Sequence, residues 1–292
     1  MKVIQSDRVI RAFGVCDPVA TVADGEEFWV ETRDCYDGQV ASELTLRSTL
    51  DSSRFMPCTG PIAIEGALPG TSLRVDILAI EPARQGFMLL NPGVGFLGPE
   101  VKRETTLIIP IDVGSSTLRL GPIVVPLHLM VGAIGTAPLG KPIPSNTPAD
   151  HGGNLDTCEI APGATLCLPV FAPGALLALG DLHAAMGDGE LCGLGVETSG
   201  RVRLRVHLST EPLQRPRVET AAEWITLASG ATLEEALRVA ASDMLSLICR
   251  VHGLEFDLAY RLLSIVGQAR ISQVVDPLVG AKVVFPKNLA KA

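Results

Sequence analysis

Two kinds of segment are missing from this chain of 292 residues. No apolar run approaches the roughly 20 residues that a helix needs to cross a bilayer, and residues 1–8 contain no apolar signal region. Lysine and arginine are scattered rather than clustered, and the net charge is −8. These absences argue against binding to nucleic acid or to an anionic membrane surface. We therefore expect a cytoplasmic protein whose partner is a small molecule.

Several chemical motifs are missing as well. The seven cysteines are odd in number, widely spaced and include no CxxC pair, as expected for reduced thiols in a cytosolic protein. The five histidines include no HxH or HExxH pair. The GxGxxG string at residues 93–98 lies between Pro92 and Pro99 and precedes no helix, so dinucleotide binding is not expected.

The pattern that is present favours a mainly β fold. Glycine turns lead into segments with apolar residues two apart at residues 26–32, 71–78 and 164–170, which is typical of antiparallel strands with one buried face. With 29 glycines, 21 prolines and 47% hydrophobic residues, the chain has material for a large sandwich or barrel core. Residues 83–105 are rich in glycine and proline and predict a loop that covers a pocket.

In the last third of the chain the spacing of the apolar residues changes. Apolar residues three and four apart predict an amphipathic helix over 232–248, and Thr232 with Glu235 resembles a capping box. A second helix is expected over 255–266, followed by a short strand at 269–275 and a tail broken by proline. We expect these helices to pack on the sheet and to hold no chemistry.

Residues 180–190 concentrate the polar side chains that the rest of the chain lacks. The segment contains Asp181, His183, Asp188 and Glu190, and a second glycine-rich cluster upstream adds Asp156. On a strand, Asp181 and His183 share a face. One imidazole with several carboxylates is a donor set for Zn²⁺ or another divalent ion, with Glu190 placed to act as general base. The alternative is that the Asp and Gly residues build turns and that His183 is structural.

The motifs around this segment resemble those of the acetamidase/formamidase family. They run in order over nearly the whole chain and comprise residues 31–34 with 38–39, 59–67, 69–70, 152–156, 168–170, 173–176, 180–190, 197–198 and 271–277. The resemblance implies a hydrolase of small linear amides such as formamide or acetamide. It also implies a duplicated β-sandwich-like architecture, a divalent metal, with zinc our choice, and a homodimer or higher homo-oligomer.

The resemblance also suggests roles for individual residues. Asp34, Asp156, Asp181 and His183 are expected near the metal, Glu190 to activate water, Glu65 to orient the amide, and Asp188 to assist catalysis. We treat residues 1–292 as a single domain with three possible subdomains, at 1–135 (N-terminal β), 136–220 (metal and active site) and 221–292 (helical and β).

Two departures from the family pattern leave the substrate open. Leu182 stands where a glycine is expected and Met186 where a glutamine is expected. A more apolar pocket would suit a larger amide or a lactam. A lactam- or urea-type hydrolase, and a catalytically silent β-sandwich that binds a structural cation, therefore remain as alternatives.

Overall fold

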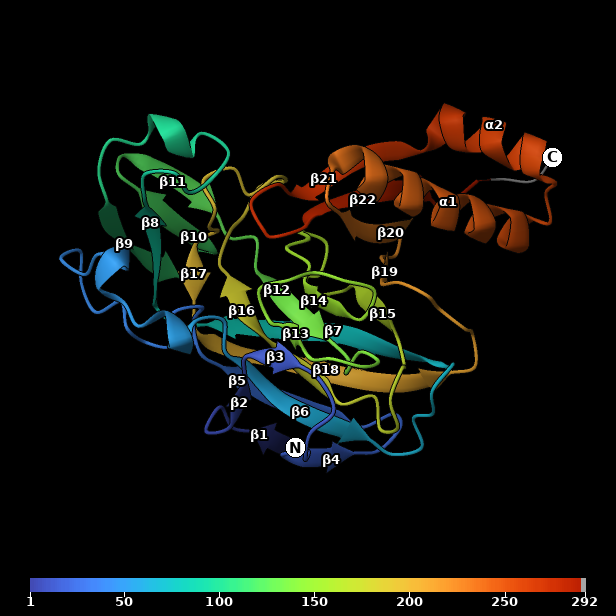
Figure 1. Ribbon diagram of the computed structural model, residues 1–292, viewed down its shortest axis with the longest axis horizontal. Coiled ribbons are helices and arrows are strands. Elements are labelled where there is room, and N and C mark those ends of the chain that lie inside the picture. The colour runs from blue at the N-terminus through green and yellow to red at the C-terminus, as the bar shows by residue number, and fades with distance from the viewer. Residues whose placement is uncertain (290–292) are drawn as a thin grey trace.

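The protein is built from two large β-sheets with a helical layer at one end, as the computed structural model shows for residues 1–289 (Figure 1). The first sheet has nine strands in the order β1-β5-β18-β7-β15-β19-β20-β22-β21. Its strands are β1 (Lys2–Ile4), β5 (Glu27–Thr32), β7 (Ser72–Pro82), β15 (Thr165–Pro169), β18 (Gly200–Ser209), β19 (Arg217–Glu219), β20 (Glu223–Gly230), β21 (Gln268–Gln273) and β22 (Val279–Pro286). The prediction of a mainly β protein is confirmed.

The second sheet has eleven strands and carries most of the polar segment singled out from the sequence. Its main path is β11-β10-β9-β8-β17-β16-β12-β14, and β6, paired with β2 and β4, joins it at β16. The strands are β2 (Val9–Ile10), β4 (Ala20–Val22), β6 (Cys58–Ile64), β8 (Gln85–Leu90), β9 (Thr105–Asp112), β10 (Thr117–Leu120), β11 (Ile123–Pro126), β12 (Met130–Gly135), β14 (Gly152–Asn154), β16 (Leu177–His183) and β17 (Glu197–Thr198). A small pair, β3 (Ala12–Phe13) and β13 (Ile143–Pro144), lies beside it.

The main core is the apolar layer between these sheets. Phe28, Val75 and Leu204 from the first sheet belong to one buried cluster with Ile62 and Leu179 from the second. The alternation expected for β5 and β7 is visible in their burial and is also found in β18, since every second residue of β5 and most of the alternate residues of the other two are buried. The sheets therefore pack face to face as a sandwich.

The two expected helices are present. Helix α1 (Leu233–His252) begins with the expected cap, because the Thr232 hydroxyl accepts a hydrogen bond from the backbone N–H of Glu235, and it ends at Gly253 in a left-handed conformation. Helix α2 (Phe256–Val266) follows it. Both cover the end of the first sheet formed by β20, β21 and β22 (Figure 1). Neither described helix is long and apolar enough to span a membrane.

Two expectations about local structure are wrong. Residues 85–90 form strand β8, which pairs with β9 over its full length, so the predicted loop is limited to the segment around residues 91–104. The expected tail also contains β22, which pairs with β20 over eight residues. Gly86 lies inside β8, and Gly280 and Pro286 lie inside β22, so glycine and proline at these positions did not mark a long irregular segment.

Candidate active site

Strand β16 places Asp181 and His183 at the centre of the second sheet. The backbone at Asp181 has a φ of 58°, and the ladder between β12 and β16 pairs neither Asp181 nor the facing Gly132. The left-handed backbone of Asp181 interrupts the ladder at this point without shifting its register. It brings the Asp181 carboxylate close to the His183 ring, at 3.6 Å from Oδ1 to Nε2.

Carboxylates from three other segments surround the same imidazole. His183 Nε2 lies 3.1 Å from Glu197 Oε1 on β17 and 3.9 Å from Asp156 Oδ1, just after β14. Donor atoms of Asp156, His183 and Glu190 all lie within 4.8 Å of one another. Asp156, Asp181, His183, Glu190 and Glu197 are each at most 7% exposed. These five side chains are called the acidic cluster below.

Burial of so much negative charge changes the protonation of the cluster. Burial raises the pKa of Asp156 well above its ordinary value, and the charges of Glu190 and Asp181 raise it further. Burial also raises the pKa of Glu190 strongly and that of Glu197 to about 7, although the His183 charge opposes both shifts. For His183 the effects are reversed: burial lowers its pKa, but Glu197 and Asp181 outweigh it and the net shift is well upward. Without a cation, the cluster therefore retains protons at neutral pH.

A loop between β21 and β22 adds a further carboxylate. The side-chain N–H₂ of Asn154 donates to Asp156 Oδ2 at 2.6 Å and to Asp276 Oδ2 at 2.8 Å, and so joins this loop to the acidic cluster. Burial raises the pKa of Asp276 to about 7, while the Asn154 hydrogen bond opposes the shift. Gln273 fixes the loop, because its Oε1 accepts hydrogen bonds from the backbone N–H groups of Val275 and Asp276.

The acidic cluster opens into a cavity of about 200 Å³. Asp181, Glu190, Glu197, Asn154 and Asp276 form its polar wall. Its other wall is largely apolar and is formed by Cys35, Tyr36, Phe55, Met56, Val94, Leu194, Val275 and Pro277, with Arg47 and Asn146 also present. A cavity with one apolar wall and a few convergent polar groups is typical of a small-molecule site.

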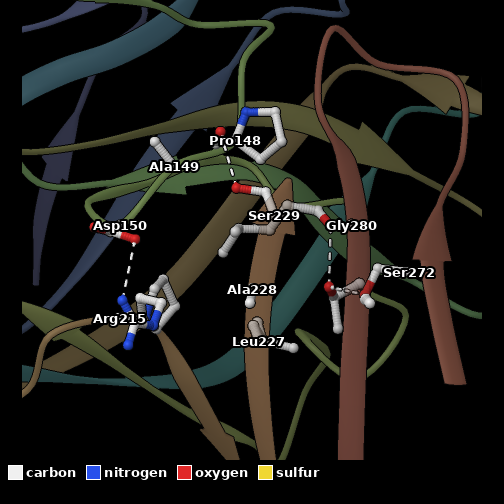
Figure 2. Close-up of a pocket in the computed structure, with 13 residues that line it drawn as sticks. Pro148, Ala149, Asp150, Arg215, Leu227, Ala228, Ser229, Ser272 and Gly280 are labelled. Atoms are coloured by element: carbon white, nitrogen blue, oxygen red, sulfur yellow. Dashed lines mark hydrogen bonds and ion pairs between the residues drawn. The ribbon is translucent and has the colours of Figure 1, made fainter. Parts of the chain in front are cut away.

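A second cavity, near β20 and β22, is not a comparable candidate (Figure 2). Its volume is about 10 Å³, which is the space of a single water molecule. Arg215 lies beside Asp150 there, and the Ser229 hydroxyl donates to the carbonyl of Pro148 (Figure 2). Its polar side chains are thus already partnered.

The structure brings together four of the seven residues proposed from the sequence: Asp156, Asp181, His183 and Glu190. Asp34 lies outside the cluster, and its carboxylate accepts hydrogen bonds from the backbone N–H groups of Tyr36 and Gly38 in a turn. Glu65 is exposed and does not line the cavity. The roles proposed for Asp34 and Glu65 remain predictions without support from this geometry.

Asp188 also lies outside the cluster. Its carboxylate contacts Lys282 Nζ at 2.6 Å and Arg270 Nη2 at 2.6 Å, and Glu159 completes this network by pairing with both cations. Burial raises the pKa of Asp188, but the two cations outweigh it and lower the pKa overall. Asp188 therefore anchors the segment that carries Glu190.

Sequence reasoning missed three members of the site. Glu197 and Asp276 belong to segments that carried the family resemblance, and Asn154 lies within the glycine-rich cluster, but no role was proposed for any of them. Glu197 stands on a strand of only two residues, and Asp276 lies between two strands that were not expected to meet the cluster. The one sequence signal for these three residues was their position in motifs that the chain shares with the family.

Several observations test whether the acidic cluster fits a cation. Asp156 Oδ1 and Glu197 Oε2 are buried without a hydrogen-bond partner among residues 1–289. A Cβ atom at Gly132 would stand 2.5 Å from both Asp156 Oδ1 and Asp181 Oδ2, so the two carboxylates occupy space that is open only because residue 132 is a glycine. Buried charges of one sign are unfavourable unless paired or bound to a metal. The residues therefore fit a divalent ion held by oxygen and imidazole ligands.

The two departures from the family pattern face away from the cavity. Leu182 is fully buried in the core between the sheets. Met186 packs against Met130 and Cys158. Neither side chain lines the cavity of the acidic cluster, so these positions give no support for a larger substrate in it.

Fold and site together define the class of protein: a β-sandwich enzyme with a carboxylate and histidine site. Two halves of the chain, residues 11–141 and 141–290, match the model of the Acetamidase/Formamidase family. The chain belongs to this family. The match in two halves also supports the expected duplication.

Individual relatives agree with this assignment. The chain is 28% identical to an acetamidase of Mycolicibacterium smegmatis over 71% of its own length and 70% of that protein. It is 27% identical to a formamidase of Methylophilus methylotrophus over 68% of its own length and 63% of that protein. The crystal structure of an acetamidase from Bacillus halodurans superposes with a TM-score of 0.95 at 39% identity and covers 97% of both chains.

Proposed function

We propose that this protein hydrolyses small linear amides of the formamide and acetamide type, with a divalent metal ion, zinc in our proposal, held by the acidic cluster. Membership of the family supports the amidase activity, the cleavage of a carbon–nitrogen bond in a linear amide. The observation that carries the metal proposal is the convergence of buried, partly unpartnered carboxylates on His183.

Asp156, Asp181 and His183 would hold the ion. When bound, a divalent ion polarises the amide carbonyl and favours ionisation of water at neutral pH. The positive charge also compensates the buried carboxylates, so that they are ionised without the protons they otherwise retain.

Glu190 is the residue we assign to proton transfer. Its carboxylate belongs to the cluster and also lines the cavity, so it reaches both the ligand groups and the substrate. It accepts the proton from the attacking water and returns it to the amide nitrogen as the carbon–nitrogen bond breaks. The products are a carboxylic acid and ammonia, which become the carboxylate and ammonium at neutral pH, and Glu190 recovers its starting state.

The cavity walls favour a short substrate. Tyr36, Phe55 and Met56 offer an apolar surface for the hydrogen or methyl group of the acyl part, and the amide faces the polar wall. A volume of about 200 Å³ accommodates a molecule of a few heavy atoms. Nothing in the cavity favours a lactam or urea-type substrate over a linear amide. The cytoplasmic location and the homo-oligomer remain predictions.

The test measures ammonia release from formamide, acetamide and longer amides before and after treatment with a chelator. We expect activity on the short amides, loss after chelation, and recovery when Zn²⁺ is added. Glu190→Gln should lower kcat by about 10²-fold or more while the metal content stays at the wild-type level. The matched control is Glu100→Gln, at an exposed position. Metal-free protein with full activity would contradict the metal dependence, and an active Glu190→Gln variant would contradict the assignment of the base.

A further inference from the structure

Cys35 lies beside the acidic cluster although no motif in the sequence marked it. It follows β5, is 2% exposed and lines the cavity together with Asp181 and Glu197. Its Sγ and one carboxylate oxygen from each of Asp181 and Glu197 all lie within 4.8 Å of one another. A thiol, two carboxylates and a cavity thus meet at one corner of the site.

The Glu197 carboxylate supplies a second, independent observation. Its Oε1 contacts His183 Nε2 at 3.1 Å, but its Oε2 is buried and has no hydrogen-bond partner among residues 1–289. A single thiol is a weak donor with one hydrogen, so Cys35 cannot satisfy both Asp181 and Glu197. A cation at this corner would satisfy all three side chains.

The distances agree with a shared ion. Zinc binds sulfur at about 2.3 Å and carboxylate oxygen at about 2.0–2.2 Å, so the ligand atoms of one tetrahedral ion lie roughly 3.3–3.7 Å apart. The separations here reach at most 4.8 Å. Side-chain movements of up to about 1 Å would bring the three atoms to ligand distance of one ion.

We propose that Cys35 is a sulfur ligand of the metal ion and shares that ion with Asp181 and Glu197. This inference rests on the proposed metal dependence and adds to it the class of metal. A thiolate selects thiophilic ions such as Zn²⁺, Co²⁺ and Cd²⁺ and disfavours Mg²⁺ and Ca²⁺, which require oxygen ligands.

Other cysteines near the site do not have this environment. Cys58 packs against Phe13, Ala133 and Ala178 in an apolar cluster. Cys158 donates a hydrogen bond from its thiol to the carbonyl of Met186. Cys35 is the cysteine that groups with two carboxylates in the part of the chain that the structure describes.

The test is the absorption spectrum of the full-length protein loaded with Co²⁺. We expect a sulfur-to-cobalt charge-transfer band in the near ultraviolet, in addition to the visible bands of the bound ion. Cys35→Ser should remove the near-ultraviolet band while Co²⁺ still binds. Cys58→Ser, the buried control, should keep both features.

The outcomes separate this inference from the proposed function. Bound, catalytically active Co²⁺ without the near-ultraviolet band in the wild type would overturn the role of Cys35 and leave metal-dependent hydrolysis intact. A protein that binds neither Co²⁺ nor Zn²⁺ would overturn both. If Cys35→Ser does not fold, the ¹¹³Cd NMR shift of the Cd²⁺-loaded wild type decides: a shift typical of one sulfur ligand supports the proposal, and a shift typical of oxygen and nitrogen ligands alone refutes it.

Discussion

Substitution of Gly132 by alanine tests whether the close approach of the two aspartates controls the site. Gly132 lies in β12, faces Asp181 across the interrupted ladder and has no left-handed backbone that alanine would resist. An added Cβ would stand 2.5 Å from Asp156 Oδ1, 2.5 Å from Asp181 Oδ2 and 2.9 Å from the Asp181 carbonyl oxygen. Both carboxylates must therefore move in the Gly132→Ala variant.

The size of the effect follows from these distances. An ordinary van der Waals contact begins at 3.4 Å, so each carboxylate oxygen must be displaced by about 0.9 Å. A misplacement of about 1 Å in a catalytic arrangement lowers the rate by about 10²-fold. The fold should be affected far less, because alanine in a strand is favoured over glycine by about 0.5–1 kcal/mol and offsets part of the strain. We expect activity to fall about 100-fold with a small change in Tm.

The assay combines three measurements on Gly132→Ala: kcat/KM for acetamide, bound metal per chain, and thermal unfolding. The matched control is Gly114→Ala, in an exposed turn where the nearest atom to an added Cβ is the end of the Asp112 side chain at 3.3 Å. The expected pattern is a normal control, and loss of activity and weaker metal binding in Gly132→Ala. Wild-type activity and metal content in Gly132→Ala would refute the argument that Asp156 and Asp181 act together at this point.

Two further predictions concern buried charge. Lys282 is fully buried and contacts Glu159 and Asp188 at 2.6 Å each, so Lys282→Met should lower the free energy of unfolding by about 3 kcal/mol in urea titrations. The control, Arg238→Met in an exposed helix pair, should lower it by about 0.5 kcal/mol. Equal losses in the two variants would contradict the predicted effect of burial. His151 is the second case, because burial lowers its pKa from 6.5 to about 4 and the unfolded chain therefore takes up the proton first. The free energy of unfolding should fall by up to about 3 kcal/mol as the pH decreases from about 6.5 to 4. Urea titrations at several pH values compare His151→Leu with the wild type, and the variant should lose this part of the pH dependence. An unchanged pH dependence in the variant would assign the effect to other groups.

Much of the architecture could be predicted because the patterns are local. The strands β5, β7 and β18 largely alternate in burial, β15 is a strand as expected but is buried on both faces, and the cap at Thr232 marks the start of α1. The strand at 85–90 was missed because Gly86 inside it and Pro92 and Gly93 shortly after it resemble a loop, whereas Gly86 packs closely on the Glu197 carbonyl in the neighbouring strand. A glycine that allows close packing of strands cannot be distinguished from a turn glycine in a single sequence.

The site could be predicted for the residues of the two polar segments, around residues 152–156 and 180–190. Asp181 and His183 share a segment, and Asp156 lies in a cluster of the same composition, so their convergence was expected. Glu197 comes from a strand of two residues whose position depends on its pairing with β16 and β8, and Cys35 lies in a turn after β5. The contacts that bring them together are between residues far apart in the sequence, and local composition does not indicate them.

The C-terminal third contributes to the site in a way that its helices do not. Helices α1 and α2 pack on β20 and β22 and place no residue in the cavity, as expected. The hairpin of β21 and β22 does contribute, because its loop supplies Asp276 and its backbone holds Gly189 through the hydrogen bond to Ser272 and the one from Val274. Gly189 precedes Glu190, and Asp188 pairs with Arg270 on β21 and Lys282 on β22, so the hairpin holds the segment of the proposed base both through its backbone and through these ion pairs. A change in this hairpin should therefore affect proton transfer by Glu190 before it affects the ligands on β16, although β21 begins 78 residues after Glu190 in the sequence.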